Sequence, residues 1–181
     1  FCAPHHSASV ASLIGGGSNA RPGEVSLAHN GVLFLDELPE FSRPALEALR
    51  QPLEDGIVSV TRVQNQAQYQ ASFMFIASMN PCPCGYYGSK TKKCRCSAHE
   101  IRRYLDRVSG PLLDRIDIQI EVDAVPVQEI NQAAPAESSA QVRERVSKAR
   151  KLQQERYRQE GIHCNAQLDA RLSKKYCELD A

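Results

Sequence analysis

Residues 30–37 read Asn30-Gly31-Val32-Leu33-Phe34-Leu35-Asp36-Glu37. An Asn-Gly turn signal opens a continuous apolar run, and two acidic residues end it. This pattern is typical of a strand that is buried on both faces of a parallel sheet. Ligands of such sheets bind at the carboxyl ends of the strands. We therefore expect Asp36 and Glu37 to lie at a ligand-binding edge of an α/β fold.

Helix and strand patterns continue after this first strand. Residues 42–55 predict one amphipathic helix, because Ser42 is a suitable N-cap and leucines recur at helical spacing. Residues 57–63 and 68–75 are rich in strand-forming residues and predict a hairpin. Its second arm is expected to continue into another buried strand at 73–77.

The pattern changes towards the end of the chain. Residues 101–108 predict a helix, and the alternating isoleucines of 116–122 predict a third strand. Strands alternating with helices indicate an α/β core over residues 1–123. Residues 124–181 are expected to form a linker and the start of a helical domain. Residues 7–24, which are small, polar and Gly-rich, predict a mobile insertion.

The last part of the chain is polar. Pro126 and Pro135 bracket a linker-like passage. Residues 139–160 predict a long helix with one weak apolar side, and 165–181 predict a shorter one. Because the sequence does not begin with Met, we expect it to be a piece of a longer protein.

Composition limits the classes of function. The 181 residues carry a formal net charge of +1, so any affinity for nucleic acid must come from a local basic patch. The sequence contains no apolar run long enough to span a membrane and no secretory signal pattern. Seven cysteines are an odd number, which suits a reducing cytoplasm better than a disulfide framework. We therefore expect a cytoplasmic protein that makes no contact with a membrane.

Asp36 and Glu37 fit the Walker B pattern, in which a buried strand delivers two consecutive carboxylates. In P-loop ATPases the first acid helps to hold Mg²⁺ near the phosphates, and the second polarises the attacking water. We assign these roles to Asp36 and Glu37 respectively. Taken alone the motif is weak, because apolar runs that end in acids are common where a strand meets solvent.

Two further residues are candidates for an ATP site. Asn80 follows the second buried strand, where its amide could orient the lytic water; the alternative is a simple Asn-Pro turn. Arg115 precedes the predicted third strand, where its guanidinium could reach a phosphate bound by a neighbouring subunit. The alternative for Arg115 is a local ion pair with Asp114 or Asp117.

A short stretch contains two Cys-x-Cys pairs. Its candidate ligands are Cys82, Cys84, Cys94 and Cys96. Four thiolates could close a tetrahedral Zn²⁺ site, with His99 as a spare ligand. Both pairs are one residue shorter than the usual Cys-x₂-Cys spacing, so free thiols or a disulfide formed during handling remain alternatives. His5 and His6 are interpreted as polar loop residues, with metal ligation as the alternative.

Basic residues are dense in the same stretch. The candidates for contact with nucleic acid are Lys90, Lys92, Lys93 and Arg95. Cations release counterions from a phosphate backbone, and the tyrosines interleaved with them can stack on bases. The alternative is ordinary solvated loop charge.

The sequence contains four segments in this order: 30–41 (NGVLFLDELPEF), 49–56 (LRQPLEDG), 79–85 (MNPCPCG) and 110–117 (GPLLDRID). Together they resemble the magnesium-chelatase-like family of AAA+ ATPases, in its ComM/YifB branch. The resemblance implies a partial AAA+ P-loop core with a parallel sheet and a pre-sensor-1 β-hairpin, followed by the start of a helical lid. It also implies ATP and Mg²⁺ as cofactors and a homo-oligomeric ring, in this family a hexamer.

By the same resemblance, Asp36 and Glu37 form Walker B, Asn80 is sensor 1 and Arg115 is a trans-acting arginine finger. Two features depart from the family pattern. The sequence contains no Gly-x-x-x-x-Gly-Lys-Ser/Thr, and the family's sensor-2 arginine is expected beyond Ala181. We therefore expect the full-length parent to hydrolyse ATP and this chain alone to be inactive.

The resemblance leaves several functions open. The first is an ATP-driven ring motor that acts on DNA, with branch-migration or helicase-like activity. The second is the motor subunit of a magnesium or cobalt chelatase. A third is a non-enzymatic, zinc-stabilised module that binds nucleic acid. The resemblance places the Cys-rich loop with the ComM/YifB branch, which favours DNA.

Overall fold

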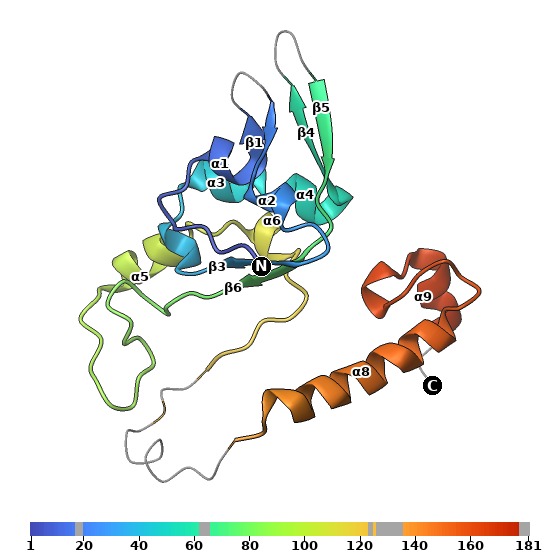
Figure 1. The fold of residues 1–181 in the computed structure, drawn as a ribbon. Helices are drawn as coiled ribbons and strands as arrows, with labels where there is room; N and C mark the ends of the chain where they lie inside the picture. The colour runs from blue at the N-terminus through green and yellow to red at the C-terminus, as the bar shows by residue number, and fades with distance from the viewer. Residues whose placement is uncertain (17–19, 62–65, 123–124, 126–135, 178–181) are drawn as a thin grey trace. The chain divides into compact units, whose positions relative to one another are not determined.

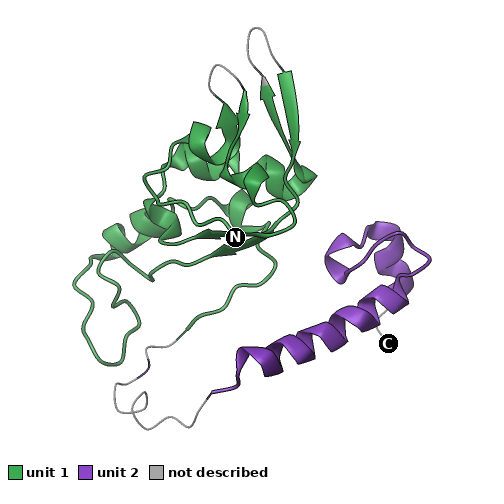
Figure 2. Ribbon diagram, viewed as in Figure 1, with its two compact units in different colours: residues 1–124 green, residues 125–181 purple. Residues whose placement is uncertain are grey.

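A computed structural model describes the chain except for residues 17–19, 62–65, 123–124, 126–135 and 178–181. The chain divides into two compact units, Phe1–Ala124 and Val125–Ala181 (Figures 1 and 2). The sequence-predicted linker at 126–135 lies outside the described residues. No helix in the described part is long and apolar enough to cross a membrane.

The centre of the first unit is a parallel pair of strands (Figure 1). Strand β3 (Val32–Leu35) pairs with β6 (Met74–Ala77) in parallel register, with Val32 opposite Met74 and Leu35 opposite Ala77. On the other side of β3, Cys2 forms an isolated parallel bridge with Leu33. The two predicted strands thus exist and pair in parallel, but the prediction that both are buried is wrong for β6, where Met74 and Ile76 are 62% and 43% exposed. Leu33 and Leu35 are fully buried, whereas the alternate residues of β3 are half-buried.

The helix predicted over 42–55 is interrupted. The structure has α3 (Arg43–Ala48) and α4 (Arg50–Asp55), with a turn at Leu49 between them. Ser42 caps α3 as expected, since its hydroxyl accepts a hydrogen bond from the Ala45 amide. The prediction overlooked Pro52, which has no N–H to donate to the carbonyl four residues earlier and clashes with it. A single continuous helix is therefore disfavoured.

The predicted hairpin is confirmed, but its second arm ends at Gln70 and does not continue into β6, from which residues 71–73 separate it. Strands β4 (Ile57–Thr61) and β5 (Gln66–Gln70) pair antiparallel, with Ile57 opposite Gln70. Val58 and Val60 anchor β4 in the hydrophobic core.

The prediction of a third strand at 116–122, after α6 (Gly110–Leu113), is wrong. This segment contains no strand, and Ile118, Ile120 and Val122 are 79–80% exposed. A strand exists only when a neighbour completes its ladder of hydrogen bonds. Among the described residues no segment pairs with this one, so its alternating pattern alone does not produce a strand.

The described residues of the Gly-rich segment form helices and strands of the first unit, contrary to the predicted mobile insertion; residues 17–19 lie outside the described residues. It contains α1 (Val10–Ile14), strands β1 (Gly15–Gly16) and β2 (Arg21–Pro22), and α2 (Glu24–Leu27). Its anchors, Leu13 and Val25, are fully buried in the core. Tyr69 on β5 donates to the Ala20 carbonyl at 2.6 Å, which ties the β4–β5 hairpin to this segment. Because small residues outnumber Leu13 and Val25 in this stretch, its composition did not indicate that these two side chains are buried.

The predicted helix at 101–108 begins and ends earlier, as α5 (Ala98–Leu105). Ser97 and Glu100 form a capping box at its start, in which each side chain bonds to the backbone of the other. This box fixes the beginning of α5 directly after the Cys-rich loop.

The second unit is helical. Helix α8 (Ser139–Arg156) leads through η2 (Asn165–Gln167) to α9 (Ala170–Tyr176). Tyr157 and Leu172 are buried, and Tyr157 packs edge-on against Tyr176 with ring centroids 5.2 Å apart. The apolar side predicted for α8 is exposed and does not contribute to this small core.

Candidate functional site

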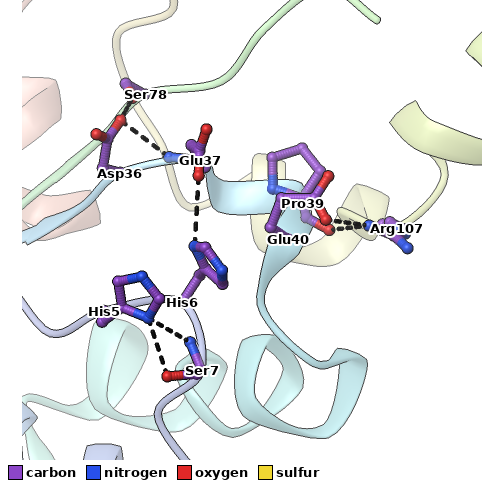
Figure 3. A network of polar contacts seen from close by, with 9 residues as sticks. All are labelled: His5, His6, Ser7, Asp36, Glu37, Pro39, Glu40, Ser78 and Arg107. Carbon is purple, nitrogen blue, oxygen red and sulfur yellow. Dashed lines mark hydrogen bonds and ion pairs between the residues drawn. The ribbon is translucent and has the colours of Figure 1, made fainter. Parts of the chain in front are cut away.

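Three parallel segments of the first unit end at one edge of the sheet (Figure 3). The segment from Cys2 leads to His5 and His6, β3 leads to Asp36 and Glu37, and β6 leads to Ser78. The sequence-predicted acids therefore lie at a carboxyl-terminal strand edge, the place where open parallel sheets bind ligands.

Asp36 is bonded to the end of β6. Its Oδ1 atom accepts a hydrogen bond from the Ser78 hydroxyl. The same atom accepts a second hydrogen bond from the Glu37 amide, at 3.0 Å. Neither of these two bonds involves the other carboxylate oxygen, Oδ2. Carboxylate oxygens are the ligands that Mg²⁺ prefers, and Asp36 presents one at a fixed position.

Glu37 is held in an unusual backbone conformation. Its φ of 53° and ψ of 49° lie in the left-handed region, which is costly for a residue other than Gly. Its Oε2 lies 3.3 Å from Nδ1 of His6, and both side chains are partly exposed. The His6 ring lies against that of His5 at a tilt of 35°, with ring centroids 4.0 Å apart, and His5 bonds to Ser7 (Figure 3). Sequence reasoning did not connect His6 with Glu37.

The segment after Glu37 is tied to α5. It forms the short helix η1 (Leu38–Glu40). Arg107, just beyond α5, donates from Nη1 to the Pro39 carbonyl and to the Glu40 carboxylate, both at 2.9 Å (Figure 3). A displacement of α5 would therefore also displace the segment next to Glu37.

Asn80 is exposed and follows β6 by a few residues. Its backbone amide lies close enough to the Tyr104 hydroxyl on α5 to favour the ionised form of that hydroxyl, and its Oδ1 lies 3.9 Å from the position that a Cβ would take on Gly85. Burial, aided by the nearby Glu40 carboxylate, raises the pKa of Tyr104. The structure brings Asn80 to the same end of the sheet as Asp36, but no described hydrogen bond joins the two.

Arg115 is not part of this group of residues. Its Nη1 donates to the Pro111 carbonyl at 2.6 Å, and its Nη2 forms an ion pair with Glu54 on α4. The side chain is 24% exposed, and its buried Nε has no partner in the described part of the chain. Hydrogen bonding and charge attraction from Arg115 lower the pKa of Glu54. An ion pair was anticipated, but with Asp114 or Asp117 and not with Glu54.

The cysteine pairs converge. The Sγ atoms of Cys82, Cys84, Cys94 and Cys96 all lie within 4.8 Å of one another. Separations of 3.4, 3.6 and 3.7 Å join the first three. A tetrahedral Zn²⁺ with Zn–S bonds of about 2.3 Å requires sulfurs about 3.8 Å apart, so this donor set fits zinc. We call these four residues the cysteine cluster.

The thiols of the cluster differ in acidity. Backbone amides of Arg95 and Tyr86 donate to Cys84 and lower its pKa to about 6. Burial raises the pKa of Cys96 to about 12. Cys84 is therefore largely a thiolate at neutral pH, the form that binds metal, whereas Cys96 would lose its proton on binding.

The predicted nucleic-acid residues of the loop are all exposed. Lys92 lies over the Tyr86 ring at 5.0 Å and donates to its hydroxyl at 3.3 Å. Beside the loop is an open groove lined by Pro83 and by residues of α3 and α5, among them Arg43, Arg102 and Arg103. The lining also includes the acidic residues Glu40, Glu100 and Asp106, so the groove is of mixed charge.

Comparison with known families identifies two matches. Residues 1–130 match the family described as "Magnesium chelatase, subunit ChlI". Residues 136–181 match "Magnesium chelatase, subunit ChlI C-terminal".

Similar proteins include Competence protein ComM of Haemophilus influenzae, which is 49% identical over 99% of this chain and 34% of its own length. YifB of Escherichia coli is 44% identical over 100% of this chain and 35% of its own. The chain therefore spans about a third of these relatives. A crystal structure of NtrX from Brucella abortus in complex with ADP covers 65% of this chain and 24% of its own, with a TM-score of 0.44 and 17% identity.

Proposed function

Because the chain belongs to the magnesium-chelatase-like family of AAA+ proteins, in the ComM/YifB branch, we propose that it supplies the hydrolysis part of the ATP site in a ring motor. The observation that carries this proposal is the meeting of Asp36, Glu37 and Ser78 at the carboxyl edge of β3 and β6. Phosphoryl transfer depends mainly on positioning and charge stabilisation, and this edge supplies fixed carboxylates.

The residues have distinct roles in the proposed site. Asp36 would hold Mg²⁺, which neutralises charge that develops on the phosphates. Glu37 would accept a proton from the attacking water, and Asn80 would orient that water. Arg115 would act in a neighbouring subunit of a homo-oligomeric ring, which we propose to be a hexamer. In this chain its guanidinium bonds to Pro111 and Glu54, and no described bond joins it to Asp36 or Glu37.

We propose DNA as the substrate, with branch migration or helicase-like remodelling as the activity of the full-length protein. Similarity to a competence protein and the exposed basic loop support this choice. With ATP, the full-length protein should convert a labelled four-way DNA junction into its products, and branched DNA should stimulate hydrolysis. A rate of ATP hydrolysis that DNA does not change, but that tetrapyrrole chelatase partners raise, would instead favour a magnesium or cobalt chelatase. The family description supports this alternative.

The basic loop provides a prediction for DNA binding. Replacing Lys90, Lys92, Lys93 and Arg95 together by alanine should weaken binding of the full-length protein to a DNA duplex, because the attraction of these cations to phosphate is electrostatic. The slope of log K against log salt should flatten by up to about 3.6, at about 0.9 for each phosphate that is no longer neutralised. Fluorescence anisotropy titrations at several salt concentrations measure both quantities.

A matched variant controls for net charge. It replaces four basic residues of α8, namely Arg143, Lys148, Arg150 and Lys151. This variant has the same charge change in the other unit and should retain more affinity and a steeper salt slope. Equal effects of the two variants would show that only overall charge matters and would move the DNA site away from the loop. DNA binding without any ATP turnover by the full-length protein would favour the non-enzymatic module.

We further propose that the cysteine cluster binds one Zn²⁺. The sulfur separations and the thiolate character of Cys84 support this assignment. Protein prepared without chelator should contain about one zinc per chain by elemental analysis, because four ligands complete a structural site. A Cys84→Ser/Cys94→Ser variant should lose the metal. A Cys164→Ser/Cys177→Ser variant removes two thiols outside the cluster and should keep it.

A well-folded chain that contains no zinc, and takes up none when zinc is added, would contradict this prediction. Zinc binding should also weaken as pH falls, since protons compete for the thiolates.

A further inference from the structure

The position of the cysteine cluster in the chain connects it with the candidate ATP site. Cys82 follows Asn80 after a single intervening residue, in the segment that leads away from β6. Cys96 directly precedes Ser97, which is the N-cap of α5. The residues between the two cysteine pairs contain turns and bends but no helix or strand (Figure 1). A metal ion in the cluster would therefore close this loop at its base.

The first end of the loop packs on Asn80. Cys82 is fully buried, and the Gly85 amide donates to its carbonyl at 3.0 Å in a tight turn. Gly85 has a φ of 78°, a conformation that favours glycine. This turn brings Gly85 against the Asn80 carboxamide, where a side chain would contact Oδ1. The turn that presents the first two thiols thus also borders the amide proposed to orient water.

The second end of the loop holds Asn80 through α5. The Tyr104 hydroxyl on this helix lies beside the Asn80 backbone amide, and Arg107 bonds to Pro39 and Glu40 beside Glu37. The capping box at Ser97 fixes where α5 begins, one residue after Cys96. Asn80 therefore lies between two structures, the Cys82–Gly85 turn and α5, and each of them begins at one pair of thiols.

We propose that a metal ion bound to the cysteine cluster positions Asn80 for ATP hydrolysis, by joining the end of β6 to the start of α5. The inference rests on the proposed ATP and zinc sites, and it assigns the metal a role separate from contact with DNA. Binding of a structural zinc supplies folding free energy, and here that free energy orders a loop that has no core of its own. The cluster is thus a positioning element, and its effect on hydrolysis passes through Asn80.

Hydrogen exchange on this chain tests the positioning directly. Removing zinc with a chelator should speed exchange of the Asn80 and Gly85 amides at least about tenfold, because the local order around them decreases. Amides of the β4–β5 hairpin should keep their protection, and added zinc should restore Asn80. The Cys164→Ser/Cys177→Ser variant serves as the control and should behave like the unmodified chain. Unchanged exchange at Asn80, or loss of protection throughout the first unit, would overturn the proposal.

A coupling measurement on the full-length protein separates positioning from general stability. Zinc removal should lower kcat for ATP and leave KM within about threefold, because Asn80 acts on the water and not on nucleotide binding. In an Asn80→Ala background, zinc removal should have little further effect on kcat, since both changes affect the same interaction. Additive losses would overturn the proposal. A full-length protein without ATPase activity would reject the proposed function, and the exchange experiment would then decide the inference alone.

Discussion

Glu37→Gln should abolish ATP hydrolysis by the full-length protein and leave ATP binding intact. The substitution keeps the size of the side chain but removes the carboxylate that would accept a proton from water. General-base catalysis contributes about 10²- to 10⁴-fold, so kcat should fall by at least about 100-fold. Phosphate release measures the turnover, and a fluorescent ATP analogue measures the binding.

Glu40→Gln is the matched control for this substitution. Glu40 lies in the same segment, but its carboxylate is bonded to Arg107. This variant should keep most of its ATP turnover. It therefore tests whether the loss of one negative charge near the site is by itself enough to abolish hydrolysis. A Glu37→Gln protein with near-normal kcat would remove Glu37 from the mechanism.

This chain alone should not hydrolyse ATP, because its sequence contains no Gly-x-x-x-x-Gly-Lys-Ser/Thr to hold the phosphates.

Arg115→Ala should also abolish turnover, and mixing it with Glu37→Gln subunits should restore part of the activity. Arginine fingers contribute about 10³- to 10⁵-fold to kcat. In a mixed ring, an Arg115→Ala subunit still has its own Glu37, and its Glu37→Gln neighbour still has Arg115. Sites between such subunits are complete. ATP turnover measured across a series of mixing ratios should therefore rise to a maximum at intermediate composition.

Glu54→Gln distinguishes this interpretation from a purely local ion pair. It removes the charge that holds Arg115 on α4 and leaves the guanidinium available to a neighbour. Its turnover should remain close to that of the unmodified protein. Mixed rings without recovered activity, or a Glu54→Gln variant as inactive as Arg115→Ala, would show that Arg115 acts within its own subunit.

Local patterns were sufficient to predict the central strands and the position of the acids. The four residues of β3 are apolar and bounded by an Asn-Gly turn and two carboxylates, so adjacent residues alone indicate both the strand and the position of the acids at its end. The cysteine cluster was predictable for the same reason, since its thiols lie in one short loop. The sequence also predicted the hairpin, because its two arms are neighbours in the chain.

Contacts between distant parts of the chain were not predictable in this way. Arg115 and Glu54 are separated by 61 positions, and no spacing rule links them. His6 reaches Glu37 because two parallel segments end side by side, which becomes visible only once Cys2 is placed next to β3. The third strand failed because an alternating pattern reports a preference, whereas a strand also needs a partner.

The left-handed backbone of Glu37 puts stability and activity in opposition at one position. Such a conformation costs an L-residue about 1–2 kcal/mol relative to its usual regions, and glycine or asparagine adopts it more readily. A search for heat-resistant variants would therefore tend to select replacements at position 37, and each would eliminate the proposed catalytic base. Retention of glutamate at this position would reflect selection for catalysis at the expense of stability, a trade-off that active sites commonly show.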